Sequence, residues 1–191
     1  MCQPVHNRHN YAEGLPFSLS SMLSLAKRIC MAEISIRSSA VSVVMLRKVP
    51  AGHEVLLMRR NGTLVGEWCQ ISGGIKKGEK AWEAAIREVR EEAGLTCRTL
   101  YTADICEQFY EADRDTISIF PVFVGFVDAD MEVVINDEHS EFKWVQISEA
   151  LSMVPFPGQR HVLKHVETEF IAREPTRQLL IHDAHAGTTT K

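Results

Sequence analysis

GGIKKGEKAWEAAIREVREEAGL, residues 73–95, is the most informative stretch of the chain. At about 100° per residue, its apolar side chains gather in one stripe, which predicts a helix with a buried face. The stripe consists of Trp82, Ile86, Val89 and Ala93. Gly94 provides the left-handed residue that ends a helix, and Leu95 can then fold back onto Val89. The segment is therefore predicted to be a loop followed by a helix with a defined end.

The polar face of this helix carries an unfavourable cluster of negative charge. Glu88, Glu91 and Glu92 fall within one arc, and like charges at such spacing are destabilising by a few tenths of a kcal/mol per pair. The last turn of a helix also favours cations over anions. Clustered carboxylates suit a hard cation, so we expect Mg²⁺, with Mn²⁺ as the second choice. The alternative is an ordinary surface face, on which Arg87 pairs with Glu83 and Glu91.

Spacing decides between these two interpretations. The segment follows the pattern G-x5-E-x7-R-E-U-x-E-E-x-G-U, where U is apolar. Seven of its named positions, at roughly one chance in fifteen each, make an accidental match very improbable. The pattern resembles the complete signature of the Nudix hydrolase superfamily. It is carried by Gly73, Glu79, Arg87, Glu88, Val89, Glu91, Glu92, Gly94 and Leu95.

The resemblance implies a fold and a metal site. The fold would be a Nudix-like α/β/α sandwich with a mixed sheet, of the α/β class. Matching positions imply metal ligands at Glu88, Glu91, Glu92 and the Gly73 carbonyl. Glu79 would be a supporting carboxylate, and Arg87 would orient the glutamates through an ion pair. Metal-assisted attack of water on phosphorus needs this kind of charge neutralisation.

A further carboxylate is expected from a distant loop. The run Glu138-His139-Ser140-Glu141-Phe142-Lys143-Trp144 resembles the E-H-x-x-aromatic-x-W pattern of many family members. Glu138 is therefore predicted to be an extra metal ligand or the general base. Asp137 and Glu141 are the alternatives. With this residue, the predicted catalytic set is Glu88, Glu91, Glu138 and Arg87.

Three residues are candidates for binding substrate. Arg59 and Arg60 end a predicted strand, and one of them could contact a phosphate or the base; solvated strand-end arginines are the alternative. Trp68 could stack on a base, or it could be a buried aromatic residue before a tight turn. Phe109 and Tyr110 lie in a segment that borders the metal helix in this fold.

The Trp68 and Ile71-Ser72-Gly73 segments, together with Glu138-His139 and Trp144, resemble the dATP and dihydroneopterin triphosphate pyrophosphohydrolases most. Cys69 departs from their usual glutamine. The expected reaction converts a nucleoside or pterin triphosphate to a monophosphate and pyrophosphate, with a purine or pterin preferred. The alternatives are hydrolysis of a diphosphate-linked sugar such as ADP-ribose, and a non-catalytic Nudix domain that only binds nucleotides. The absence of a lysine-rich turn before the helix disfavours dinucleoside tetraphosphates.

Composition limits the other function classes. The 191 residues are 45% apolar and 24% charged, as in an ordinary globular domain. A net charge of −4 gives no footprint for a nucleic acid polymer, and no apolar run approaches the roughly 18 residues of a membrane span. The five cysteines never form C-x-x-C, which favours a reducing, cytoplasmic location.

We expect three parts in the chain. Residues 1–30 would be a mobile leader or the product of an upstream start before Met31, with a targeting peptide as the alternative. Residues 31–175 would form the Nudix domain, and residues 176–191 a C-terminal tail. Strands are predicted at 40–46, 54–58, 68–72, 100–109, 116–127 and 141–147, and a second helix at 158–172.

Overall fold

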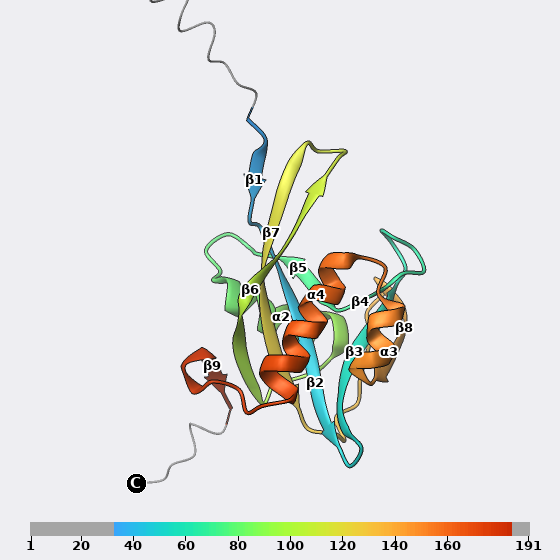
Figure 1. Cartoon of the computed structure of the whole chain (residues 1–191). Coiled ribbons are helices and arrows are strands. Elements are labelled where there is room, and N and C mark those ends of the chain that lie inside the picture. The colour runs from blue at the N-terminus through green and yellow to red at the C-terminus, as the bar shows by residue number, and fades with distance from the viewer. Residues whose placement is uncertain (1–32, 185–191) are drawn as a thin grey trace, which may run out of the picture. The chain divides into compact units, whose positions relative to one another are not determined.

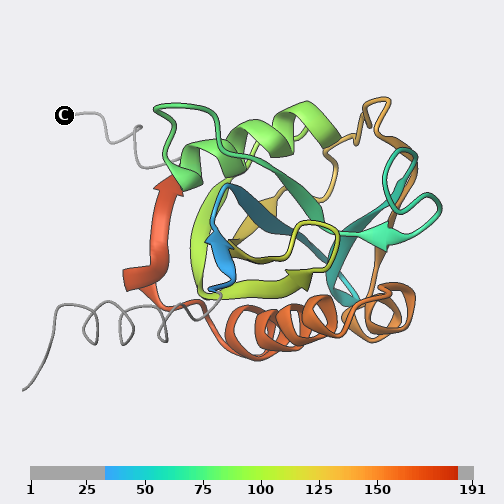
Figure 2. The same cartoon turned by 90° about the horizontal axis from the view of Figure 1, so that it is seen from above.

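A computed structural model describes residues 33–184 of the chain. The described residues form a mixed β-sheet with α2 on one face and with α3 and α4 on the other, as Figures 1 and 2 show. The α/β/α sandwich predicted from the sequence is therefore confirmed. The expected leader, residues 1–30, lies outside the described residues.

The sheet is ordered β4-β3-β2-β7-β6-β9, with β1 paired to β7, β5 to β2 and β8 to β3. β2 lies at its centre, pairs in parallel with β7 and is buried over most of its length, as its run of β-branched and apolar residues predicts. The strands are β1 Ser35–Arg37, β2 Ala40–Val49, β3 Gly52–Arg60, β4 Trp68–Cys69, β5 Ile71–Gly74, β6 Thr99–Glu111, β7 Thr116–Val127, β8 His139–Val145 and β9 Leu180–Asp183.

The helices are α2 Ala81–Ala93, α3 Ile147–Met153 and α4 Pro157–Val166. The second predicted helix ends earlier as an α-helix, because its last turn, Glu167–Ile171, widens to π-helical hydrogen bonding. α3 was not predicted: at seven residues it is too short to show a helical period in the sequence. No helix among residues 33–184 is long and apolar enough to span a bilayer.

The strand predicted at 68–72 is in fact two strands. β4 pairs with β3, whereas β5 pairs with β2. The chain therefore crosses from one sheet neighbour to another at Gln70, whose side chain is buried. This crossing brings the Gly73-Gly74 end of β5 beneath α2.

Part of the segment expected to be a C-terminal tail belongs to the sheet. Leu180–Asp183 form β9, which pairs antiparallel with β6 through Leu180 and Tyr101 and through His182 and Leu100. The tail prediction is corrected for these residues, because the edge of β6 offers free backbone groups that a following extended segment can pair with.

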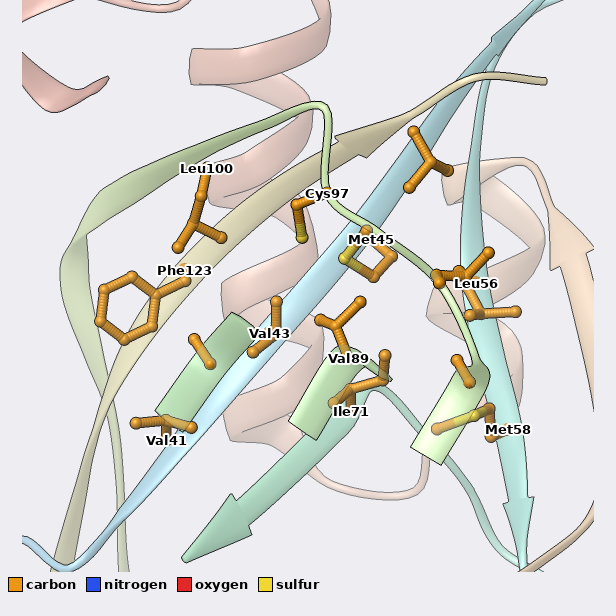
Figure 3. Packing of buried hydrophobic residues seen from close by; sticks show 14 of the residues in the cluster. Val41, Val43, Met45, Leu56, Met58, Ile71, Val89, Cys97, Leu100 and Phe123 are labelled. Carbon is orange, nitrogen blue, oxygen red and sulfur yellow. The ribbon is translucent and has the colours of Figure 1, made fainter. Parts of the chain in front are cut away.

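Two apolar clusters hold the layers together. One lies between the sheet and α2, and Figure 3 shows Val43 and Met45 of β2 in it with Val89 of α2. The other lies between the sheet and the helices α3 and α4, and includes Val44, Leu163 and Phe170. Successive side chains of β2 point to opposite faces of the sheet and thus pack into both clusters.

Candidate functional site

α2 lies across the sheet with its C-terminal half over β5. Gly94 ends the helix with a φ of 67°, and its N–H donates to the Arg90 carbonyl at 3.0 Å, as the sequence predicts. The buried face differs from the predicted stripe, because Trp82 and Ile86 lie at its edge and are only partly buried. The fully buried apolar side chains are Ala84, Ala85, Val89 and Ala93.

The same buried face includes two glutamates. Glu88 is 8% exposed and Glu92 is 3% exposed, so they lie at the sheet rather than on an open acidic surface. Glu91 points outward, with 49% of its side chain exposed. Buried carboxylates are uncommon unless a partner compensates them. The burial of two glutamates therefore makes the C-terminal end of α2 a candidate functional site.

Gly73 makes room for one of these carboxylates. A Cβ built on Gly73 would overlap the carboxylate of Glu88. The main chain of β5 therefore approaches the end of the Glu88 side chain as closely as a residue without a side chain allows. The arrangement forms a cradle between β5 and α2.

Arg87 connects the glutamates to the loop before the helix. Its Nε and Nη2 donate to Glu79 at 2.8 and 2.9 Å, and its Nη2 also donates to the Gly74 carbonyl at 2.7 Å. Its Nη1 donates to Glu88 at 2.6 Å and to Glu91 at 2.9 Å. The guanidinium thus orients three carboxylates at once, which only a planar fork of donors can do.

Glu92 lies in an environment that disfavours its negative charge. Burial, and after it the charges of Glu88 and Glu138, raise the pKa of Glu92 to about 8, while Arg60 opposes this. The ring of His139 lies 3.8 Å from the Glu92 carboxylate. Burial lowers the pKa of His139, so its ring adds little positive charge. Within the described part of the chain, Glu92 therefore lacks a compensating cation in contact with it, whereas Glu88 is paired with Arg87 at 2.6 Å.

These residues fit a hard divalent cation. The carboxylates of the site are oxygen donors, and the absence of a side chain at Gly73 leaves room for the Glu88 carboxylate beside β5. Among residues 33–184, no three acidic, histidine or cysteine side chains are already arranged as a metal centre. Glu88 and Glu91 direct oxygens at Arg87 instead.

The candidates for the distant carboxylate are Glu138, Asp137 and Glu141. Of these, Glu138 lies near Glu92 of α2. It acts on the pKa of Glu92, and its loop is attached to the β3 end by a hydrogen bond from the Asn61 N–H to the Glu138 carbonyl at 2.8 Å. Glu141 is directed elsewhere, 3.7 Å from both Arg59 and Lys143.

The two strand-end arginines separate. Arg60 lines a cavity of about 730 Å³ and is close enough to Glu92 to affect its pKa. Its guanidinium is held by the Thr63 carbonyl and hydroxyl at 2.9 and 2.8 Å. Arg59 turns away, toward the Gly66 carbonyl and Glu141.

The cavity lies along β4 and β5, includes Ser72 and Gly73, and extends toward the start of α4; the glutamates of α2 are not part of its lining. Its lining includes Gly73 and Trp68, and also Phe109 and Tyr110 of β6. Trp68 has Lys143 over its ring at 5.0 Å. Gly73 is the residue that this cavity and the Glu88 cradle have in common.

Several residues of the site were not singled out as ligands in the sequence. His139 was part of the quoted Glu138 pattern, which is the signal that could have revealed its contact with Glu92. Gln70 and Glu107 line the cavity, and no local pattern marks them. Their positions depend on how β5 and β6 lie relative to β2.

The family model described as NUDIX domain matches residues 37–166 of the chain. An octanoyltransferase from Myxococcus xanthus is 34% identical over 130 residues, which cover 67% of this chain. The match spans 36% of that protein's length. An asymmetrical bis(5'-nucleosyl)-tetraphosphatase from Caenorhabditis elegans is 28% identical over 127 residues, which are 65% of this chain and 91% of that protein. The nucleoside triphosphatase NudI of Escherichia coli is 38% identical over 93 residues, 44% of this chain and 65% of that protein.

Solved structures share the fold. An Ap4A hydrolase from C. elegans superposes with a TM-score of 0.61 at 23% identity, covering 69% of this chain and 96% of that one. The dihydroneopterin triphosphate pyrophosphohydrolase of E. coli gives a TM-score of 0.59 at 21% identity, covering 73% of this chain and 99% of that one.

Proposed function

The chain belongs to the NUDIX domain family, and from this we propose that it is a metal-dependent pyrophosphohydrolase of a nucleoside or pterin triphosphate. Water would attack the α-phosphorus, and the bond between that phosphorus and the oxygen bridging to the β-phosphorus would break. The products would be a monophosphate and pyrophosphate. The similarity to NudI of E. coli, which is named a nucleoside triphosphatase, supports this substrate class.

One observation carries the proposal. Glu92 is buried on α2, four residues after the Glu88 of the Gly73 cradle, and burial together with the charges of Glu88 and Glu138 raises the pKa of Glu92 to about 8. A buried carboxyl whose ionisation is disfavoured in this way is unfavourable for folding at neutral pH. A function that brings divalent cations and phosphates to this place gives a reason for it.

In this proposal, divalent cations are held by Glu88, Glu91, Glu92, Glu138 and the Gly73 carbonyl. When bound, Mg²⁺ or Mn²⁺ neutralises phosphate charge and lowers the pKa of a water molecule. Glu138 is exposed and lies on a loop, so it is also free to accept the proton of that water. Arg87 and Glu79 act by positioning the carboxylates of α2.

Arg60 supplies the remaining positive charge for the phosphate chain. Its side chain lines the cavity and is close enough to Glu92 to act on the pKa of that group, and Thr63 fixes its orientation. An arginine held in this way can donate to a phosphate oxygen with little further loss of conformational freedom. The base or pterin would then lie near Trp68.

Two other substrates stay open. The C. elegans relative is named for cleaving a dinucleoside tetraphosphate, which carries a chain of four phosphates between two nucleosides. ADP-ribose presents a diphosphate that the same metal site could hold. A domain that only binds nucleotides is disfavoured, because Glu79, Arg87 and the acidic cluster are all retained.

The test is a substrate panel with the full-length chain and Mg²⁺. The kcat/KM values are measured for dGTP, dATP, dCTP, dihydroneopterin triphosphate, ADP-ribose and a dinucleoside tetraphosphate, with separate detection of phosphate and pyrophosphate. We expect pyrophosphate from a purine or pterin triphosphate, and ¹⁸O from labelled water in the monophosphate. A clear preference for ADP-ribose or the tetraphosphate, or for dCTP over both purines, would overturn the substrate class. Loss of all turnover in Glu88→Gln assigns the activity to this site.

A further inference from the structure

The floor of the cavity is formed by two polar side chains, Gln70 and Glu107, on the α4 side of the sheet. Gln70 Nε2 donates to Ser42 Oγ and to Glu107 Oε2, each at 3.1 Å. Ser42 also hydrogen-bonds to the Glu107 carboxylate. Glu107 has no lysine or arginine partner among residues 33–184, so its carboxylate is held by neutral donors alone. It lies near Gly158 at the start of α4, with Oε1 3.7 Å from the place of a Cβ on that glycine.

One acceptor in this floor has no partner. Gln70 is 2% exposed, and within the described residues its Oε1 accepts no hydrogen bond. Leaving a buried acceptor unsatisfied is unfavourable by about 1–3 kcal/mol, and native structures contain few such groups. The amide orientation is fixed by its other end, because Nε2 must donate to the Glu107 carboxylate. Because Gln70 lines the cavity, a ligand there that brought a donor within reach of Oε1 would remove this cost.

Aromatic side chains form the walls above this floor. Phe109 lies two residues from Glu107 on β6, so both project from the same face of the strand. Phe120 packs edge-to-face against Phe109 with ring centroids 5.3 Å apart, which restrains its ring. Phe109 is nevertheless exposed, as is Phe156 before α4. Exposed rings around a polar floor suit a flat heteroaromatic ring that stacks and presents its polar edge downward.

The hydrogen-bonding groups of the cavity floor decide which kind of heteroaromatic ring can bind there. An amide oxygen and a carboxylate are both acceptors, so the ligand edge should carry adjacent donors. A ring N–H beside an exocyclic NH₂, the edge of a 2-amino-4-oxo-pyrimidine ring, has this pattern, and guanine and pterins share it. Adenine instead places a ring acceptor beside its amine, and that acceptor would face the carboxylate.

We propose that Glu107 and Gln70 recognise the 2-amino-4-oxo edge of a guanine or pterin ring and so select the triphosphate that is hydrolysed. This assignment rests on the proposed triphosphate hydrolysis and narrows its substrate class. Adenine nucleotides are then poor substrates, although their phosphate chain is identical.

The experiment compares kcat/KM for dGTP, dITP, dATP and dihydroneopterin triphosphate. Inosine lacks the exocyclic amine, so dITP should fall between dGTP and dATP. We expect dGTP or the pterin to exceed dATP by about 10-fold or more, as one bidentate contact gives. The substrate with the higher kcat/KM, dGTP or dihydroneopterin triphosphate, then shows whether the recognised ring is guanine or a pterin. If neither dGTP nor the pterin exceeds dATP, the inference is overturned and the hydrolase proposal is left standing.

Variants refine the test. Glu107→Gln presents a donor beside an acceptor, which complements adenine, so kcat/KM for dGTP should fall by about 10-fold or more while that for dATP falls less or rises. The effect should appear mainly in KM. Glu132→Gln removes the same charge from an exposed loop position outside the cavity and should leave the dGTP-to-dATP ratio unchanged.

Binding separates the two proposals. The affinities of non-hydrolysable α,β-methylene analogues of dGTP and dATP are measured by calorimetry with Mg²⁺. If no triphosphate is hydrolysed but the dGTP analogue binds more tightly and loses this preference in Glu107→Gln, the ring assignment holds and the hydrolase proposal fails. If neither analogue is preferred by the wild-type protein, the ring assignment fails, whatever the stability of the variant.

Discussion

The carboxylate of Glu88 lies where a side chain on Gly73 would have to be. The two residues belong to different elements, β5 and α2, and this contact joins them at the candidate metal site. A glycine is required here because of space rather than backbone conformation, since Gly73 does not adopt a positive φ. The glycine before the helix and the first glutamate of the cluster are therefore one structural unit.

Gly73→Ala should strongly reduce turnover with little loss of stability. The added methyl group meets the flexible end of Glu88 rather than main chain, so the carboxylate moves aside and the fold persists. A displacement of about 1 Å at a catalytic group can lower kcat/KM by about 10²-fold. Gly74→Ala is the matched control, because its Cβ would meet only the Ser39 carbonyl at 3.9 Å. Equal activity losses in the two variants would contradict this explanation.

Glu91→Gln and Glu92→Gln, made separately, should each remove most of the turnover at saturating Mg²⁺. A loss of about 10³-fold corresponds to about 4 kcal/mol of transition-state stabilisation. Glu83→Gln, at the other end of α2, is the control, because glutamine can still accept from the Lys80 N–H as Glu83 does at 2.9 Å. Near-normal rates in either glutamate variant would exclude that residue as a ligand.

Glu92→Gln should also raise the melting temperature of the metal-free protein. The variant replaces a buried carboxyl, whose ionisation the folded state opposes near Glu88 and Glu138, by a neutral amide. A gain of about 1 kcal/mol would raise the melting temperature by about 2–4 °C. Thermal unfolding in EDTA measures it, and the exposed Glu91, whose carboxylate pairs with Arg87 and Lys76, should show no such gain. A lower melting temperature for Glu92→Gln would show that the buried carboxylate stabilises the fold.

Glu79→Gln should lower stability at neutral pH but not in strong acid. The Arg87 hydrogen bonds, aided by the Lys76 N–H, lower the pKa of Glu79 to about 2. A carboxyl whose pKa is lower in the folded state stabilises the protein above its ordinary pKa of about 4.5 and loses this effect as the pH falls toward 2. The difference in melting temperature between wild type and variant should therefore shrink between pH 5 and about pH 2. A difference that is constant over this range would show that the ion pair does not contribute.

Arg60→Ala should weaken substrate binding, whereas Arg59→Ala should not. Arg60 faces the cavity and the acidic cluster, and Arg59 faces Glu141. Loss of one charge-assisted phosphate contact should lower kcat/KM by about 10-fold or more, mainly through KM. Because the two variants remove the same charge from adjacent positions, a general electrostatic effect would lower both values equally.

Much of the α2 site could be predicted because its residues are close in sequence. The helix end at Gly94 and the ion pairing of Arg87 with glutamates of α2 follow from spacings within the helix, whereas the contact of Arg87 with Glu79 was not predicted. The predicted buried stripe was less accurate, since Trp82 and Ile86 lie at its edge. Amphipathic spacing gives the direction of the apolar face, but the sheet surface beneath decides which flanking residues are covered.

Other features depended on strand pairing. The sequence could not tell which of Arg59 and Arg60 faces the cavity. The alternation of side chains along a strand predicts only that two adjacent residues face opposite sides of the sheet. β4 and β8 fix which side meets the cavity. Likewise β9 and α3 are too short to give a periodic pattern, and their positions follow from partners far away in the chain.

The sequence by itself determined the family, the loop-helix unit and the set of metal-binding candidates, because these depend on the chemistry and spacing of neighbouring residues. Only the tertiary structure decided that Glu88 and Glu92 are buried, that Glu138 approaches them and that Gln70 and Glu107 meet in the cavity floor. Those contacts join β5, α2, β6 and the loop before β8. Hydrogen bonding and packing between segments far apart in the chain create them, and no local pattern encodes such distances.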